Sequence, residues 1–387
     1  MVLSLNERDE SHRRLRLRGL LKPKKSDLLL LIFTLAPHIY FYSIAFQRVN
    51  FQVILTSRSG LLNTMMAKTL YNSELLEQFN RHFEKHHMTH YQVLPLHPLL
   101  YRIVYYLCFR SWKRATMVYV IGLSILCNFV FSRFVYCARF IKNPIIPSLI
   151  FTVYPFRSLF LRSVTNEYCL VIILFCLIYI GKQTRSFRLV QFSSALMILS
   201  YESGFLIILG FIIGSILSKN RKTFRYLFYG FICGSSVLSI FHKIICGRFF
   251  PLFFDMLTFY RYPFQELLSN ALKIGQLRQF HGLYGYYIIP LIACLMMLTI
   301  EKMIGIPLLF AFLYAASYKD MKAIDLACPI EAIATIVGFD ALIKHPRFKN
   351  SLFVLAPLYI LGSFYLTGLI FQEKEFFRSV NSRVYTM

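Results

Sequence analysis

The densest group of residues that could do chemistry lies in the polar segment between Gln47 and Tyr91. His82, His86 and His90 recur every four residues, so a helix there would carry all three on one face. That spacing could hold a metal ion, but no acidic residue completes a known zinc signature. The alternative is a solvated or interfacial loop, and we therefore expect no metal site.

The same segment holds two acids, Glu74 and Glu77, which are three residues apart and hence share a helical face. Apolar residues recur there with helical spacing, at Leu70, Leu75, Leu76 and Phe79. This pattern predicts one or two short amphipathic helices lying at a membrane interface. A second amphipathic stretch, Arg261–Gly285, carries Lys273, Arg278 and His281.

Acidic residues also occur within or beside strongly apolar runs, where a charge is costly and is a functional candidate by default. Glu167 precedes one such run, and Glu202 lies inside another. For Glu167 the structural alternative is a carboxylate that satisfies a helix N-terminus. For Glu202 it is a buried pair with a nearby Lys or Arg. Asp325 and Glu331 have no stronger claim than a loop between two runs.

The elements that must position these side chains are long apolar runs. Of 387 residues, 57% are hydrophobic and 16% are charged, whereas a soluble domain has about 25% charged residues. The runs of membrane-spanning character are Leu28–Phe46, Met117–Phe134, Tyr168–Ile180 with its flanks, Ser193–Leu217, Tyr226–Phe241, Tyr286–Ile300 and Ser351–Phe371. With weaker runs included, the sequence predicts an all-α polytopic membrane protein with about ten transmembrane helices.

The net charge of +25 clusters in short connectors between these runs, at Arg110–Arg114, Lys182–Arg188 and Ser218–Arg225. Such connectors are typical of cytoplasmic loops. No nucleic-acid-binding motif accompanies them, so we expect membrane lipids and no nucleic acid as partners.

The basic residues before Ser26 predict a cytosolic N-terminal tail, residues 1–26, without a signal-peptide cleavage site. A transmembrane domain, 27–372, and a short C-terminal tail, 373–387, follow. The first loop, 47–91, would then face the lumen or the exterior.

The nine cysteines lie mostly inside apolar runs and form no Cys-x-x-Cys pair. We expect them to act as small buried hydrophobes and not as a disulfide framework. The sequence contains no glycine-rich phosphate loop, and we expect no cofactor.

The segment YQVLPLHPLLYRIVYYL, Tyr91–Leu107, joins the histidine-rich loop to an apolar stretch. Pro95 and Pro98 mark a helix start, because proline is tolerated in the first turn, where its missing N–H has no partner to lose. We expect a helix that enters the bilayer here, with His97 in its first turn.

The stretch Pro144–Ile208 resembles the PIG-V family of GPI mannosyltransferases, which belong to the GT-C class of multi-pass glycosyltransferases. In that family an apolar helix ends in a proline and is followed by a Tyr-Ser-Glu motif. After this motif come a helix, a short basic loop and a second helix, which ends in an Arg-Ser-Asn-Gly turn. The matching positions here are, in order, Pro155, Phe160, Thr165-Asn166-Glu167, Lys182–Arg188 and Tyr201–Gly204, in which Tyr201 stands for the family's Arg. The segment VLPLHPLL is similar to the family's Phe-Phe-Pro-x-x-Pro-Leu segment before its second span, and Gln276–Ala293 is similar to a later aromatic-rich segment.

The resemblance implies an enzyme of the endoplasmic reticulum membrane that moves mannose from dolichyl phosphate mannose to a GPI lipid. The product would carry the second mannose in alpha-1,6 linkage, and a small accessory membrane subunit is a further implied partner. Such an inverting transfer needs a carboxylate to take the acceptor proton and cations to stabilise the lipid phosphate that leaves.

The family keeps a catalytic Asp in a Trp-Asp pair of its first luminal loop. Counting back from Pro95, that pair falls on Asn72-Ser73. The loop 47–91 contains no Asp. Either Glu74, the next residue, has taken over as the catalytic acid, with Glu77 one turn along the same face, or the active site has been lost. The residues that the resemblance implies for substrate binding are Glu167, Glu202, His86, His87, His97, Arg278 and His281.

Two other classes of protein fit the same composition. One is a non-catalytic multi-pass subunit with a GT-C-like scaffold, such as a component of GPI-anchor assembly or transfer. The other is a lipid or solute transporter, a class in which internal repeats are frequent; we find no internal repeat in this sequence.

Overall fold

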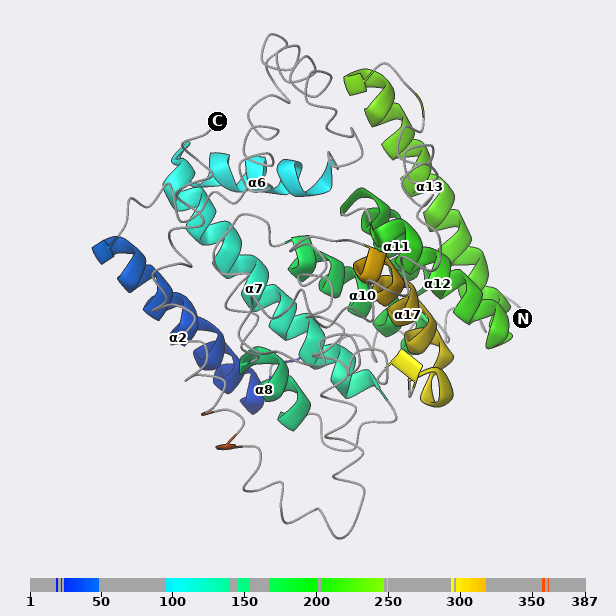
Figure 1. The fold of residues 1–387 in the computed structure, drawn as a ribbon, viewed down its shortest axis with the longest axis horizontal. Coiled ribbons are helices and arrows are strands. Elements are labelled where there is room, and N and C mark those ends of the chain that lie inside the picture. Colours follow the sequence, from blue (N-terminus) through cyan, green and yellow to red (C-terminus); the bar gives the residue numbers. More distant parts are fainter. Residues whose placement is uncertain are drawn as a thin grey trace, which may run out of the picture.

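The computed structural model describes residues 24–48, 95–138, 145–153, 167–200, 203–246, 294–295 and 297–317, with single positions at 19, 22, 249, 357, 358 and 361. All regular secondary structure in these residues is α-helical (Figure 1). The helices are α2 (Lys25–Arg48), α6 (Leu96–Leu107), α7 (Trp112–Cys137), α8 (Ile145–Val153), α10 (Glu167–Gln183), α11 (Phe187–Ser200), α12 (Ser203–Leu217), α13 (Arg221–Cys246) and α17 (Lys302–Ser317). The prediction of an all-α protein is confirmed for this part of the chain.

Two of the described helices are long and apolar enough to cross a membrane. They cover Arg114–Cys137 in α7 and Arg221–Ile244 in α13. At 1.5 Å per residue, the 26 residues of α7 extend about 39 Å, more than the roughly 30 Å of a bilayer's hydrocarbon core. The predicted runs Met117–Phe134 and Tyr226–Phe241 lie inside these two helices.

The predicted apolar run Ser193–Leu217 is not one helix. It divides into α11, which ends at Ser200, and α12, which begins at Ser203. The two helices fold back on each other so closely that a Cβ on Gly204 would overlap the carbonyl group of Met197. A glycine at position 204 permits the start of α12 to lie this close to α11.

The contacts between helix ends give the bundle two distinct ends. Lys24 Nζ lies 3.0 Å from the ring centroid of Tyr136, which places the start of α2 against the last turn of α7. The rings of Phe134 and Tyr179 are 5.2 Å apart, so the last turn of α10 lies there too. We call this the Lys24 end, and the opposite one the His97 end.

The starts of three further helices lie at the Lys24 end. Lys182, in the last turn of α10, forms an ion pair of 3.0 Å with Glu301, immediately before α17. The connectors between α10 and α11 and between α12 and α13 are tight turns that return the chain at this end. In Figure 1, α2 and α17 accordingly begin in the lower part of the view, while α6 lies across the upper part.

All three basic connectors stop a helix with a residue in the left-handed conformation. Arg110, Arg185 and Lys219 have φ of 59°, 57° and 53°. In each connector an N–H bonds to the carbonyl five residues earlier, as Ser186 does to Gly181 at 2.8 Å, which is the Schellman pattern of helix ends. Cations are also favourable at a helix C-terminus, because they oppose its partial negative charge.

The expectation that all three basic connectors face the same side is wrong. Lys182–Arg188 and Ser218–Arg225 lie at the Lys24 end, with the start of α2. Arg110–Arg114 instead joins α6 to α7 at the His97 end, because the unbroken α7 runs from Trp112 to the Lys24 end. Two of the connectors therefore share a side with the N-terminal basic segment, and one does not.

The core forms around α10, which is apolar on every side, as expected of a helix surrounded by others. Nearly every side chain from Cys169 to Ile180 is buried. Phe175 packs on Phe134 of α7 and Phe211 of α12, with ring centroids 6.5 and 4.9 Å apart. By contrast, α13 exposes a row of large apolar side chains, namely Phe228, Tyr229, Ile232, Val237, Ile240 and Ile244.

Two Gly-x-x-x-Gly pairs allow helix backbones to touch, as is common where helices pack in membranes. On α13, a Cβ added to Gly234 would lie 2.7 Å from the carbonyl oxygen of Ala195 in α11. On α12, a Cβ added to Gly210 would lie 2.7 Å from the Cα of Pro307 in α17. The small residues therefore fix which helices become neighbours.

Candidate functional site

The segment around His97 forms a helix, as the two prolines predict, but not a spanning one. The helix α6 has 12 residues and an extent of about 18 Å, which is too short to cross a bilayer. It ends at Leu107, and the chain turns through Cys108–Arg110 before α7 begins. The helix α6 lies across the His97 end of the bundle (Figure 1), and entry of the chain into the bilayer at this segment stays a prediction.

The buried face of α6 is polar and aromatic. His97 and Tyr101 are each 1% exposed, and both face the first half of α7. His97 Nδ1 is hydrogen-bonded to the hydroxyl of Tyr119, and the Tyr101 hydroxyl lies 2.7 Å from the hydroxyl of Thr116. The ring centroids of Tyr119 and Tyr101 are 5.4 Å apart, so the four side chains form one buried polar group.

This His97 group holds its imidazole in a fixed orientation, because the bond at Nδ1 determines how the ring is turned. Histidine beside a phenol can pass a proton at near-neutral pH. The structure places His97 inside the packing of α6 on α7, so its predicted role toward a substrate remains a prediction.

The other predicted site residues are described only in part. Glu167 is the first residue of α10, and because α10 runs toward the Lys24 end, its start lies at the His97 end. The remaining predicted residues lie outside the described part of the chain; they are Glu74, Glu77, His86, His87, Glu202, Arg278 and His281. Within its described residues, the structure brings the starts of α6 and α10 to one end of the bundle.

No group of three or more His, Cys, Asp or Glu that could hold a metal ion occurs within the described residues. The regularly spaced histidines at 82, 86 and 90 are not among them.

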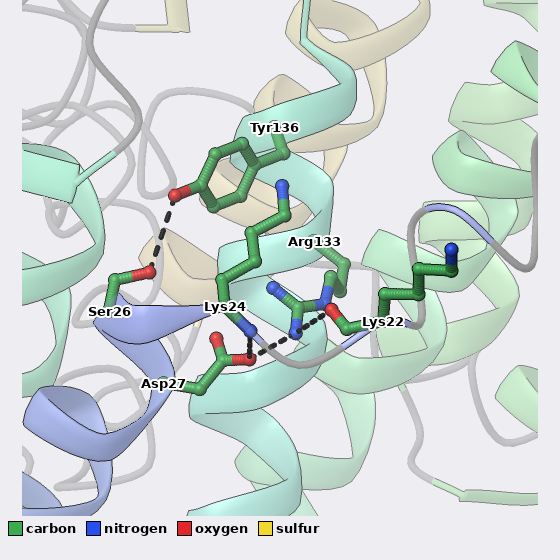
Figure 2. Close-up of polar contacts among 6 residues, drawn as sticks. All are labelled: Lys22, Lys24, Ser26, Asp27, Arg133 and Tyr136. Carbon is green, nitrogen blue, oxygen red and sulfur yellow. Dashed lines mark hydrogen bonds and ion pairs between the residues drawn. The ribbon is translucent and has the colours of Figure 1, made fainter.

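A second polar group lies at the Lys24 end and was not predicted from the sequence. Arg133 of α7 donates to Oδ2 of Asp27 at 2.5 Å and to the carbonyl of Lys22 at 3.4 Å (Figure 2). The backbone N–H of Lys24 donates to the same Asp27 oxygen at 2.8 Å. The sequence does contain a sign of this group, because Arg133 is a cation inside the apolar run Met117–Phe134. A charge there is as costly as the charges of Glu167 and Glu202 in their apolar runs.

This group, which we call the Lys24 cluster, also contains Ser26 and Tyr136. Their hydroxyl oxygens lie 3.3 Å apart and join α2 to α7 (Figure 2). The Lys24 ammonium faces the Tyr136 ring, a favourable cation–π arrangement.

The charged side chains of the cluster are Arg133, Asp27 and Lys24. Arg133, whose side chain is only 3% exposed, forms an ion pair with Asp27, while the Lys24 ammonium lies over the Tyr136 ring and Lys22 takes part only through its backbone carbonyl. Partial burial, and secondly the Arg133 charge, lower the pKa of Lys24, while Asp27 acts in the opposite direction. The cluster therefore ties the start of α2 to the last turns of α7.

Comparison of the chain with protein-family models, with curated proteins and with solved structures found no match.

Proposed function

We propose that the protein is a multi-pass mannosyltransferase of the endoplasmic reticulum membrane that transfers mannose from dolichyl phosphate mannose to a GPI lipid. The proposal includes about ten spans, of which α7 and α13 are the strongest candidates among the described helices. It rests first on the order of motifs in the sequence, from VLPLHPLL through Thr165-Asn166-Glu167 to Tyr201–Gly204.

One structural observation carries the proposal further. The motifs are far apart in the sequence, yet the helix ends that flank them share the His97 end. There α6 lies against the first half of α7, α10 begins at Glu167, α11 ends at Ser200 and α12 begins at Ser203. A transferase site needs its groups on one side of the membrane, and the shared position of these helix ends supports the proposal.

The charges favour an orientation in which the His97 end is luminal. The Lys24 end carries the segment Lys22–Lys25 and two of the basic connectors, in which Arg185, Arg188, Lys219, Arg221 and Lys222 are exposed. Lysine and arginine near span ends are retained on the cytosolic side. The donor and the acceptor lipid would then be met at the His97 end.

In the proposed reaction the acceptor hydroxyl attacks the anomeric carbon of mannose while the bond to the lipid phosphate breaks. Glu74 takes the hydroxyl proton, and cationic side chains stabilise the phosphate that leaves. His86, His87, Arg278 and His281 are the candidates for that second role, and Glu167 and Glu202 for binding the acceptor. No nucleotide or metal is required.

The proposal is tested by expressing the chain in cells that lack the second GPI mannosyltransferase. Restored surface display of GPI-anchored proteins is expected from the natural sequence and not from a Glu74→Gln variant at equal abundance. Rescue by both proteins would contradict the catalytic role of Glu74, and rescue by neither, with both present in the endoplasmic reticulum, would contradict the mannosyltransferase proposal.

A further inference from the structure

The two faces of α6 are arranged in the reverse of the order usual in water. Its buried face carries His97 and Tyr101, whose polar atoms pair with side chains of α7. Its exposed face is apolar, with large side chains every three or four residues, namely Leu99, Ile103, Tyr106 and Leu107. Ile103 is 55% exposed and Leu107 is 73% exposed. A contiguous exposed face of this kind indicates an apolar surround or partner.

The pairing of α6 with α7 gives the depth of this face in a membrane. Tyr119, the partner of His97, lies seven residues after Trp112, or about 10 Å along α7. Because α7 is about 9 Å longer than the hydrocarbon core, a centred α7 enters the core about 5 Å from its start. The start of α6 therefore lies about 5 Å inside the hydrocarbon core, while its end stays near the headgroups.

The charges around α6 match the surface of a bilayer. Residues 96–116 contain no Asp or Glu, and all four of their Lys and Arg side chains are cations that phosphate groups attract. The Arg102 guanidinium lies 5.3 and 4.8 Å from the ring centroids of Tyr105 and Tyr106, and it donates to the Tyr106 hydroxyl at 2.9 Å. Arginine and tyrosine beside an apolar face are typical of helices at a membrane interface.

The surface of α7 below α6 indicates which surround covers the apolar face. Leu126 lies seven residues, or about two turns, after Tyr119 and hence on the same side of α7. Tyr119 is covered by α6, whereas Leu126 is exposed. Since Leu126 lies near the middle of a candidate span, the acyl chains that cover it would meet α6 directly above.

We propose that α6 is inserted obliquely into the leaflet at the His97 end, with Leu99 and Ile103 among the acyl chains, and that it does not cross the membrane. The partner of its exposed face is the lipid bilayer, and Arg102 reaches the phosphate layer. The inference rests on α7 as a span, which is part of the proposed function, but not on mannosyl transfer.

The chain has one tryptophan, Trp112, so a reporter can be placed at one position at a time. In full chains that carry Trp112→Phe, the reporters are Leu99→Trp and, separately, Ile103→Trp, each reconstituted in phosphatidylcholine vesicles. Phosphatidylcholine brominated near the headgroup end of its acyl chains should remove most of the emission of both reporters. The same lipid brominated near the ends of the chains should remove little, because a bromine quenches an indole only at close range.

Leu126→Trp in the same background is the matched control, because Leu126 is exposed near the middle of α7. Lipid brominated near the chain ends should quench this reporter most. If the Leu126 reporter is quenched by lipid and the two α6 reporters are not, the embedding of α6 is overturned. Quenching of the α6 reporters by aqueous acrylamide would then show a face in water, and quenching by neither agent would show a face covered by protein.

Absence of lipid quenching at the Leu126 reporter would remove α7 as a span and the embedding of α6 with it. Unchanged melting temperatures check that the variants fold, and if Leu99→Trp does not, Ile103→Trp carries the same test. Failure of the α6 reporters alone leaves the mannosyltransferase proposal standing, because that proposal is tested by rescue of GPI-anchored proteins.

Discussion

Single side chains at the two ends of this bundle have different surroundings. At the His97 end, the polar atoms of His97, Tyr119, Tyr101 and Thr116 are paired with one another inside the packing. At the Lys24 end, Arg133 pairs with Asp27, but two of its nitrogens and one Asp27 oxygen are buried without a hydrogen-bond partner. The first arrangement is satisfied internally, whereas the second buries Arg133 with only Nη2 hydrogen-bonded.

The hydrogen bond between Tyr119 and His97 is expected to stabilise the fold. Tyr119→Phe removes only the hydroxyl and leaves a buried imidazole nitrogen without that partner, which should lower the free energy of unfolding by about 1–3 kcal/mol. Tyr229→Phe is the control, because the Tyr229 side chain is exposed. Equal melting temperatures for the two variants in detergent would show that the bond contributes nothing.

The catalytic role of Glu74 is the riskiest residue-level prediction. A general base contributes about 10²–10⁴-fold to a rate, so Glu74→Gln should lower mannosyl transfer by that factor at normal protein abundance. Glu77→Gln is the control, since it removes the same charge one turn along the same predicted face. If Glu77 is essential and Glu74 is dispensable, the predicted register is wrong by one turn.

At the scale of elements, glycines rather than large side chains determine which helices pack together. Gly234→Ala would place a methyl group 2.7 Å from the Ala195 carbonyl oxygen and should cost about 1–3 kcal/mol of stability. In α7, Gly122 has no atom within 4 Å of an added Cβ, so Gly122→Ala should be neutral or gain up to about 1 kcal/mol. Thermal unfolding in detergent compares them, and an equal effect of both substitutions would contradict close contact of α11 and α13.

The elements also show what sequence reasoning could reach. Helix type followed from the apolar runs, so α2, α7, α10 and α13 lie where runs were predicted. The end of α11 at Ser200, the start of α12 at Ser203 and the short length of α6 could not be predicted from hydrophobicity. An apolar run that forms two packed helices is as hydrophobic as one that forms a single spanning helix. Arg133 was visible in its run, but its pairing with Asp27 depends on the antiparallel packing of α2 on α7, which the sequence alone does not specify.

At the scale of the whole molecule, the structure makes the topology testable. We expect a glycosylation acceptor inserted near Gly60 to be modified in the endoplasmic reticulum and one at the N-terminus to remain unmodified. Cysteines introduced at Arg185 and Arg110 should react with impermeant thiol reagents from opposite sides, because these connectors lie at opposite ends of the bundle. Labelling of both from the same side would contradict the direction of α7 across the membrane.

The contact of α17 with α12 has a consequence for how the chain is made. Gly210 and Gly214 fit against Pro307 and Lys302, and Lys182 pairs with Glu301. During translation, α10 and α12 are complete well before residues 301–317 leave the ribosome. Until then, the surface of α12 that α17 will cover is exposed to lipid or to a chaperone. We expect a chain truncated after Cys246 to be retained and degraded by quality control, since nothing would then arrive to close that side.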